Sequence, residues 1–499
     1  MIDSRSARSR FTPRLLLVAL IPFVVLCTMN SATYRYGASD QAFYIPAVAL
    51  AMHPDLFPRD APLIRAQAKL MLSDEAFGAV SSMTGISLPT LAFSVYLGTL
   101  VLLAAAAWLI ASRVYRTAWA GLALLAALTL RHSISRTGTN TLEGYFHPRQ
   151  LAFALGAMAV AFVLRRRTVP AALAIAIAAA VHPTTAMWFA IWLTIAVAVN
   201  ERRWRIPIAI ALVAAGVVGL WLLTAGPLAG RLTVIDPEWL ATLDTKDYLF
   251  PLDWPIATWL FNLAYLPVIV WIYRWRRASG LAQDVESGLV AGALGLAAVF
   301  IVVLPFNVAH VALAVQLQAS RLFWMLDFLA VIYLVWALTE GAVATTRRAA
   351  IAAIALCALS AARGGYVKFV EFPQRPLAQI GIPDNDWGKA MAWARTTDVG
   401  SEWLADPIHA ARYGMSLRVA AGRDVFVEAL KDAAIGMYDR AVAIRTRDRI
   451  TAIGDFGTLT TERARALASA YGLDYLVVER PFELPLAFQS GEVRIYRLR

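Results

Sequence analysis

Long apolar runs separated by short polar segments occupy most of the chain, up to about residue 363. A helix that crosses a bilayer needs about 20 predominantly apolar residues. Eleven runs fit this pattern, the shorter ones less closely, and they predict an all-α membrane bundle of about 11 transmembrane helices. The predicted spans are 15–33, 88–111, 117–131, 150–164, 169–181, 185–199, 206–224, 256–273, 287–304, 322–339 and 349–362.

The polar segments between these runs differ in charge on the two sides of the predicted bundle. With the N-terminus in the cytoplasm, the cytoplasmic segments hold 17 Lys and Arg residues against five acids, whereas the opposite segments of the membrane region hold 11 of each. Cytoplasmic loops are enriched in Lys and Arg. We therefore predict a multi-pass protein of the cytoplasmic membrane with an uncleaved first helix. Its N-terminus, with Arg5, Arg8, Arg10 and Arg14, is cytoplasmic, and its C-terminal region is extracytoplasmic, or periplasmic.

One stretch of the bundle needs a pair of short helices. Arg165–Arg167 and Arg202–Arg205 both favour the cytoplasm, and a single helix between them cannot return to its own side. Two helices that meet at His182–Thr185 would return, with Pro183 in the first turn of the second helix, where its missing N–H costs nothing. Helices that end inside a bundle usually line a cavity, because their free ends need polar partners.

The pattern changes after residue 363. Four segments rich in Val, Leu and aromatic residues predict strands, namely "SEWLADP", "DVFVEAL", "DYLVVER" and "EVRIYRL". Two segments predict helices, "DNDWGKAMAWARTT" and "TTERARALASAYG", the second with Thr460 as N-cap and Gly472 as its end. The sequence thus divides into a transmembrane domain, 1–363, with long outer loops at 34–87 and 225–255, and a small extracytoplasmic α/β domain, 364–499.

Composition agrees with a membrane protein. Hydrophobic residues make up 59% of the 499 residues and charged residues only 16%. The net charge of +12 does not indicate nucleic-acid binding, because residues 364–499 hold 18 basic and 17 acidic residues and the excess lies in the cytoplasmic loops. Cys27 and Cys357 lie in apolar segments and are interpreted as packed side chains.

Polar residues with possible chemistry gather on the outer face of the predicted bundle. They are Asp40, His53 and Asp60 in the first outer loop; Glu143, His147 and Arg149 in the second; His182 between the short helices; Asp236, Asp244, Asp247 and Asp253 in loop 225–255; and His310, Gln316, Gln318 and Arg321 before the tenth span. Ionisable groups at the bilayer edge are costly unless they face an aqueous cavity or one another. The sequence has no zinc-type His/Cys spacing, no phosphate-binding glycine loop and no serine-hydrolase elbow. We expect one outer cleft whose chemistry uses carboxylates, Arg and His.

Each of these residues also has a structural interpretation. Asp40 could cap a helix that begins at Gln41, and His147-Pro148 and His182-Pro183 could open helices. Arg149 and Arg321 could be interfacial anchors. Asp327 falls inside a predicted span and needs a partner, which the sequence does not identify.

The whole arrangement resembles the GT-C glycosyltransferases, integral membrane enzymes that include oligosaccharyltransferases, protein O-mannosyltransferases and aminoarabinose transferases. The resemblance consists of a first helix followed by a long outer loop with an early acid ("GASDQAFY"), short paired helices, a His-Pro turn, a late outer-face Arg and a C-terminal exported α/β domain. It implies a polyprenyl-phosphate-linked sugar donor and an acceptor that is a glycan, a lipid or a protein, at the outer face of the membrane.

The resemblance also implies roles for individual residues. Asp40 would be the catalytic base, with Glu143 as second choice or orienting partner. Arg149, Arg321, His147, His182, Gln318 and Tyr44 would bind the lipid phosphate and the sugar. Many GT-C enzymes have an Asp-x-Asp or Glu-x-Asp motif in the first outer loop, whereas this loop offers only Asp40. No cofactor is predicted with certainty, and a divalent metal is possible without support from such a motif.

Two other classes of function stay open at this point. A transporter or flippase of a lipid-linked or anionic substrate would also use short helices and buried charge. A non-catalytic scaffold that binds a glycan lipid would need no second acid. We place both below an inverting glycosyltransferase. Against a transporter, the polar residues gather on one face and do not cross the midplane.

Overall fold

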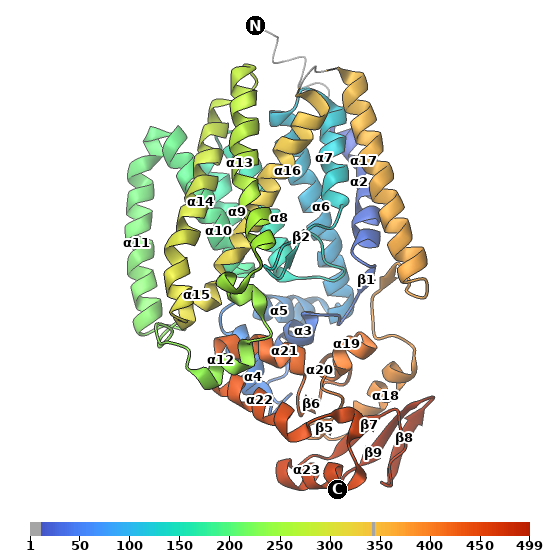
Figure 1. The fold of residues 1–499 in the computed structure, drawn as a ribbon. Coiled ribbons are helices and arrows are strands. Elements are labelled where there is room, and N and C mark those ends of the chain that lie inside the picture. Colours follow the sequence, from blue (N-terminus) through green and yellow to red (C-terminus); the bar gives the residue numbers. More distant parts are fainter. Residues whose placement is uncertain (1–10, 342–344) are drawn as a thin grey trace.

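The computed structural model describes residues 11–341 and 345–499, so Arg5, Arg8 and Arg10 of the predicted cytoplasmic N-terminus lie outside the described residues. A bundle of long helices carries a smaller domain at one end (Figure 1). We call the end that carries this C-terminal domain the domain end.

Each of the eleven predicted spans coincides with a helix. They are α2 (Pro13–Asn30), α6 (Leu88–Val114), α7 (Ala118–Thr129), α8 (Pro148–Val163), α9 (Thr168–Val181), α10 (Pro183–Asn200), α11 (Arg205–Thr224), α13 (Ile256–Ala278), α14 (Asp284–Val308), α16 (Phe323–Glu340) and α17 (Thr346–Tyr366). Within the described residues, eight helical segments are long and apolar enough to cross a membrane, and α7, α8 and α9 are shorter. The predicted membrane bundle is confirmed.

Small residues allow the helices of the bundle to pack closely. A Cβ at Gly292 of α14 would lie 2.3 Å from the carbonyl oxygen of Trp192 on α10, and one at Gly156 of α8 would lie 2.2 Å from the Phe189 ring. Helix α16 is the most deeply buried span, whereas α11 has no buried residue and stands apart from the bundle (Figure 1).

Short elements connect the spans. The first loop at the domain end contains β1 (Tyr34–Arg35), α3 (Gln41–Met52), α4 (Ala61–Ala68) and α5 (Ser73–Thr84). Helix α8 is preceded by the hairpin of β2 (Ser133–Ile134) and β3 (Thr139–Asn140), and α11 is preceded by η1 (Arg202–Trp204). Helix α13 follows α12 (Pro237–Leu243), η2 (Asp247–Leu249) and η3 (Pro251–Asp253), and α16 follows α15 (Ala312–Leu317) and η4 (Ala319–Leu322). Apart from η1, these connections bring polar side chains to the end of the bundle where the C-terminal domain lies.

The C-terminal domain is built on a five-stranded mixed sheet. Its order is β6 (Asp424–Val425), β5 (Glu402–Leu404), β7 (Tyr475–Val478), β9 (Val493–Arg497) and β8 (Leu486–Ser490). Strands β6, β5 and β7 are parallel to one another, and β9 is antiparallel to both of its neighbours, β7 and β8. Its helices are α18 (Asp386–Ala394), α19 (His409–Tyr413), α20 (Leu417–Ala421), α21 (Ala429–Ile435), η6 (Gly436–Tyr438), α22 (Arg440–Ile453), η7 (Phe456–Thr458) and α23 (Thr461–Tyr471).

The four predicted strands and both predicted helices are present. Thr460 caps α23 by accepting a hydrogen bond from the Arg463 N–H, and Gly472 ends it in the left-handed conformation. The sequence analysis missed β8 and α19 to α22. Helix α17 and the π-helical turn Val367–Glu371 continue past residue 364, so the last span and the start of the C-terminal domain are one continuous helical segment.

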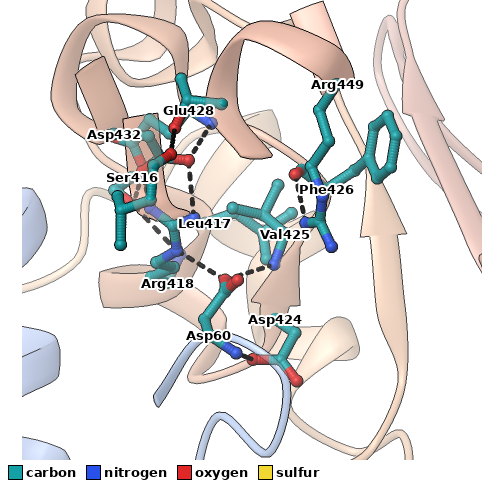
Figure 2. A network of polar contacts seen from close by, with 12 residues as sticks. Asp60, Ser416, Leu417, Arg418, Asp424, Val425, Phe426, Glu428, Asp432 and Arg449 are labelled. Atoms are coloured by element: carbon teal, nitrogen blue, oxygen red, sulfur yellow. Dashed lines mark hydrogen bonds and ion pairs between the residues drawn. The ribbon is translucent and has the colours of Figure 1, made fainter. Parts of the chain in front are cut away.

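Strand pairing and buried ion pairs attach the C-terminal domain to the first loop. Strand β1 pairs in parallel with β4 (Ala378–Gln379). Deeper in, the fully buried Asp60 carboxylate accepts a hydrogen bond from Arg418 Nε at 2.7 Å and one from the Val425 N–H at 3.1 Å, and pairs with Arg445. Arg418 also binds both carboxylate oxygens of Asp432, at 2.6 and 3.0 Å, as Figure 2 shows. We call Asp60, Arg418 and Asp432 the buried ion cluster.

Replacement of Arg418 by Met should destabilise the protein by about 3–5 kcal/mol, because Asp60 and Asp432 would remain buried without their cation. The measurement is thermal unfolding in nanodiscs, followed by tryptophan fluorescence and by proteolysis of the C-terminal domain. Arg440→Met is the control, since Arg440 binds Asp236 and Glu238 with half of its side chain exposed, and little change is expected. Equal effects of the two substitutions would contradict the prediction.

Candidate active site

A small cavity lies between the domain end of the bundle and the C-terminal domain, with a volume of about 60 Å³. Seven of the eight residues predicted for the site line it: Asp40, Tyr44, His147, Arg149, His182, Gln318 and Arg321. They come from α3, the starts of α8 and α10, and the segment between α15 and α16. Glu143 is not among the lining residues.

Asp40 precedes α3, but its side chain makes no capping hydrogen bond. The interpretation of this acid as a helix cap is therefore wrong. One carboxylate oxygen lies 2.7 Å from Lys431 Nζ and the other lies 3.2 Å from His147 Nε2. Burial raises the pKa of Asp40, but Lys431 and His147 outweigh burial and hold this pKa well below its usual range. Asp40 is thus ionised at neutral pH.

His147 and His182 both cap helices, as one interpretation of the His-Pro pairs predicted. Nδ1 of His147 accepts the Arg149 N–H at 3.1 Å, and Nδ1 of His182 accepts the Thr185 N–H at 3.3 Å. An Nδ1 that accepts carries no proton, so in the neutral ring the proton is on Nε2. His147 therefore donates from Nε2 to Asp40. Capping fixes the tautomer, and the same ring orients the carboxylate.

Arg149 is held by Glu143. Its guanidinium lies 3.0 Å from Glu143 Oε1 and 3.2 Å from the Gly138 carbonyl oxygen, and both side chains are almost fully buried. Burial raises the pKa of Glu143 against the effect of Arg149. Glu143 contacts the guanidinium from outside the cavity lining, which is the position of an orienting partner.

Arg321 has a different environment. Gln318 adopts the left-handed conformation (φ 48°, ψ 55°), which turns the chain from α15 into η4 and brings Arg321 to the cavity. Arg321 forms no ion pair with any residue in 11–341 or 345–499, and its Nε is buried without a hydrogen-bond partner, as are Arg149 Nε and Gln318 Oε1. Two guanidinium groups and two imidazole N–H groups line this cavity against one carboxylate, which makes it suited to an anionic ligand.

Sequence reasoning missed the other lining residues. These are Phe43, Gln67, Tyr248, Ala434, Met437 and Tyr438. The last three belong to the C-terminal domain, whose segment 429–438 covers the cavity. Nothing in the local sequence of this segment identifies it as part of a site, because its position depends on how the domain docks.

Several polar residues of the same face lie elsewhere. Asp60 belongs to the buried ion cluster, and Asp236 and Asp247 pair with Arg440 and Arg136. Asp327, which needed a partner, lies 3.4 Å from His132 Nδ1. Nowhere in the described chain do three His, Cys, Asp or Glu side chains form a group that could hold a metal ion.

Comparison with known proteins supports the fold. No protein-family model and no curated protein matches the sequence. Among solved structures, the arabinofuranosyltransferase AftD from Mycobacteria is similar over 98% of this chain, with a TM-score of 0.51 and 15% identity. A variant of that enzyme gives a TM-score of 0.50, 14% identity and the same 98% coverage of this chain.

This chain spans 40% of the AftD chain and 42% of the AftD variant. The apo oligosaccharyltransferase of Archaeoglobus fulgidus matches with a lower TM-score of 0.42 and 13% identity, covering 93% of this chain and 69% of that one. At these identities the similarity concerns the fold. The expected helical membrane bundle with a small C-terminal domain is confirmed, and its fold is similar to that of AftD.

The histidines predict a pH dependence of stability. Burial and Arg149 lower the pKa of His147 to about 3, and burial and Arg321 hold that of His182 well below its usual range. Below the ordinary pKa of about 6.5 the unfolded chain binds a proton that folded His147 does not, so stability falls on acidification by about 1.4 kcal/mol per pH unit between about pH 6.5 and 3.

His147→Asn should remove this contribution while an Asn cap remains. Thermal unfolding of both proteins between about pH 7.5 and 5 should show the difference in Tm shifting toward the variant as the pH falls. A constant difference over this range would show that folded His147 titrates normally.

Proposed function

We propose that the protein is an inverting glycosyltransferase of the GT-C type, which moves a sugar from a polyprenyl-phosphate donor to an acceptor at the outer face of the cytoplasmic membrane. The observation that carries the proposal is the cavity at the domain end, which the ionised Asp40 lines together with Arg149 and Arg321. The GT-C fold agrees with this function, and the Lys and Arg distribution supports an extracytoplasmic domain end and C-terminal domain.

In the proposed reaction, the acceptor hydroxyl attacks the anomeric carbon and Asp40 takes its proton. The bond from that carbon to the phosphate oxygen breaks on the opposite side, and polyprenyl phosphate leaves with the electron pair. The transition state resembles an oxocarbenium ion, so negative charge develops on the phosphate. Arg321, which has no ion-pair partner in the described chain, and Arg149, which is paired on its far side with Glu143, would bind that charge.

The cavity also requires movement. A space of about 60 Å³ holds a small anion but no sugar attached to a phosphate. Of its lining residues, Ala434, Met437 and Tyr438 belong to the C-terminal domain. Displacement of residues 434–438 would enlarge the cavity, while Lys431 and Asp432, which lie earlier in α21, keep their contacts.

Asp40→Asn should lower transfer by about 10²-fold or more, because the base is lost while the shape is kept. The assay uses membranes from cells that express the protein, a panel of polyprenyl-phosphate pentoses and hexoses, and mass spectrometry of released polyprenyl phosphate. Asp253→Asn, at an exposed acid of the same end, is the control that should retain activity. Normal transfer by Asp40→Asn would remove Asp40 as the base. Accumulation of an unmodified sugar lipid in sealed vesicles would instead indicate a transporter.

Arg321→Lys should lower kcat/KM by about 10-fold or more even though the charge is kept, because an ammonium cannot bind two phosphate oxygens as a planar fork does. The matched variant is Arg440→Lys, at an exposed ion pair of the C-terminal domain. Unchanged kinetics in Arg321→Lys would show that this guanidinium does not contact the phosphate.

A further inference from the structure

Helix α21 of the C-terminal domain brings a lysine to the candidate base. Lys431 Nζ lies 2.7 Å from Asp40 Oδ1 and 3.3 Å from Ser39 Oγ, with 17% of the lysine side chain and 27% of the Asp40 side chain exposed. Lys246 Nζ binds the carbonyl oxygen of Leu430 at 3.1 Å and so supports the same turn from the membrane domain. The ammonium group is therefore held in place and is not a freely moving surface charge.

The buried ion cluster fixes the position of this helix. Asp432, next to Lys431 in the chain, accepts hydrogen bonds from Arg418 through both oxygens, and Arg418 binds Asp60 of the first loop. Glu428, just before α21, is held by the Ser416 hydroxyl at 2.6 Å. Figure 2 shows these side chains converging on Arg418 between the loop and the domain. Asp40 of the first loop thus contacts Lys431 directly, and Asp60 of the same loop is linked to the neighbouring Asp432 through Arg418.

Other charged and titratable groups also surround Asp40. They are Lys246, Arg149, His147, Glu143, Tyr44, Tyr145 and Tyr248. His147 is neutral, Arg149 is engaged by Glu143, and Lys246 binds the backbone of α21. Among the described side chains, Lys431 is the cation in direct contact with the Asp40 carboxylate.

We propose that Lys431 is a positioning residue of the active site, which the C-terminal domain inserts to orient the Asp40 carboxylate and keep it ionised. This inference rests on the proposed function. Lys431 and His147 each hold one oxygen, so the carboxylate cannot rotate about its terminal bond without breaking both contacts. The docked C-terminal domain thereby determines the state of a base that the membrane domain carries.

The test compares the pH profile of kcat/KM for release of polyprenyl phosphate in Lys431→Met, Lys431→Arg and the wild-type protein. Transfer requires ionised Asp40 and is lost as the pH falls through its pKa. Removal of the ammonium raises that pKa, so the acid limb of Lys431→Met should move up by about 1 to 3 pH units. Lys431→Arg should restore the limb toward wild type. Lys389→Met, at an exposed lysine 3.6 Å from Asp384, should leave it unchanged.

A second measurement does not depend on activity. In a thermal double-mutant cycle, Lys431→Met should lower Tm in the wild-type background and have little effect in Asp40→Asn, because the contact is then already lost. Additive effects, or an unmoved acid limb in Lys431→Met, would overturn the proposed role. Absence of transfer by the wild-type protein would overturn the proposed function and the role of Lys431 in it, whereas the coupling would still report the contact.

Discussion

The buried ion cluster is the contact on which the arrangement of the two domains depends. Asp60 and Arg418 are both buried; groups of the C-terminal domain satisfy Asp60, and Arg418 is satisfied by Asp60 and by Asp432 of its own domain. A buried ion pair contributes little net stability compared with an apolar contact of the same size, but it tolerates only one geometry. We therefore attribute to this cluster the fixed register of α21 against the first loop, and to the apolar surfaces around it most of the binding energy.

That register has a chemical consequence. Asp40 and Asp60 belong to one loop, and Lys431 and Asp432 belong to one helical turn, so the pairing of Asp60 and Asp432 through Arg418 also places Lys431 beside Asp40. The backbone N–H groups of Arg59 and Asp60 both bind the Asp424 carboxylate at 3.0 Å, which holds the same loop to the sheet of the C-terminal domain. Structural contacts and the candidate active site are thus parts of one interface.

The sequence was sufficient for features that depend on local patterns. Apolar runs identified the helices, and His-Pro pairs marked the starts of α8 and α10. Six residues of the outer-face cluster line one cavity, together with Tyr44, which the resemblance implied. Local patterns could not predict contacts across the domain interface, such as that between Lys431 and Asp40, which lie 391 positions apart. The segment "DVFVEAL" was predicted to be a strand, but only Asp424–Val425 is one. Asp327 likewise needed its partner His132 from a loop 195 positions earlier. Domain docking determines such pairs, and periodicity carries no information about docking.

The two histidines show how one local motif serves both fold and site. A proline in the first turn needs no N–H partner, and the imidazole Nδ1 satisfies one of the free amides of that turn. The ring must then keep its proton on Nε2. At His147 this proton points to Asp40, so the cap that starts α8 also fixes one side of the carboxylate. Both helices begin at the cavity, where their N-termini add partial positive charge to that of Arg149 and Arg321. The cavity is therefore cationic through its backbone as well as its side chains, and Asp40 is the acidic side chain in its lining. An anion that enters is attracted by Arg149, Arg321 and the two helix N-termini and repelled by Asp40, and the proposed transfer between a phosphate and a hydroxyl would use this asymmetry.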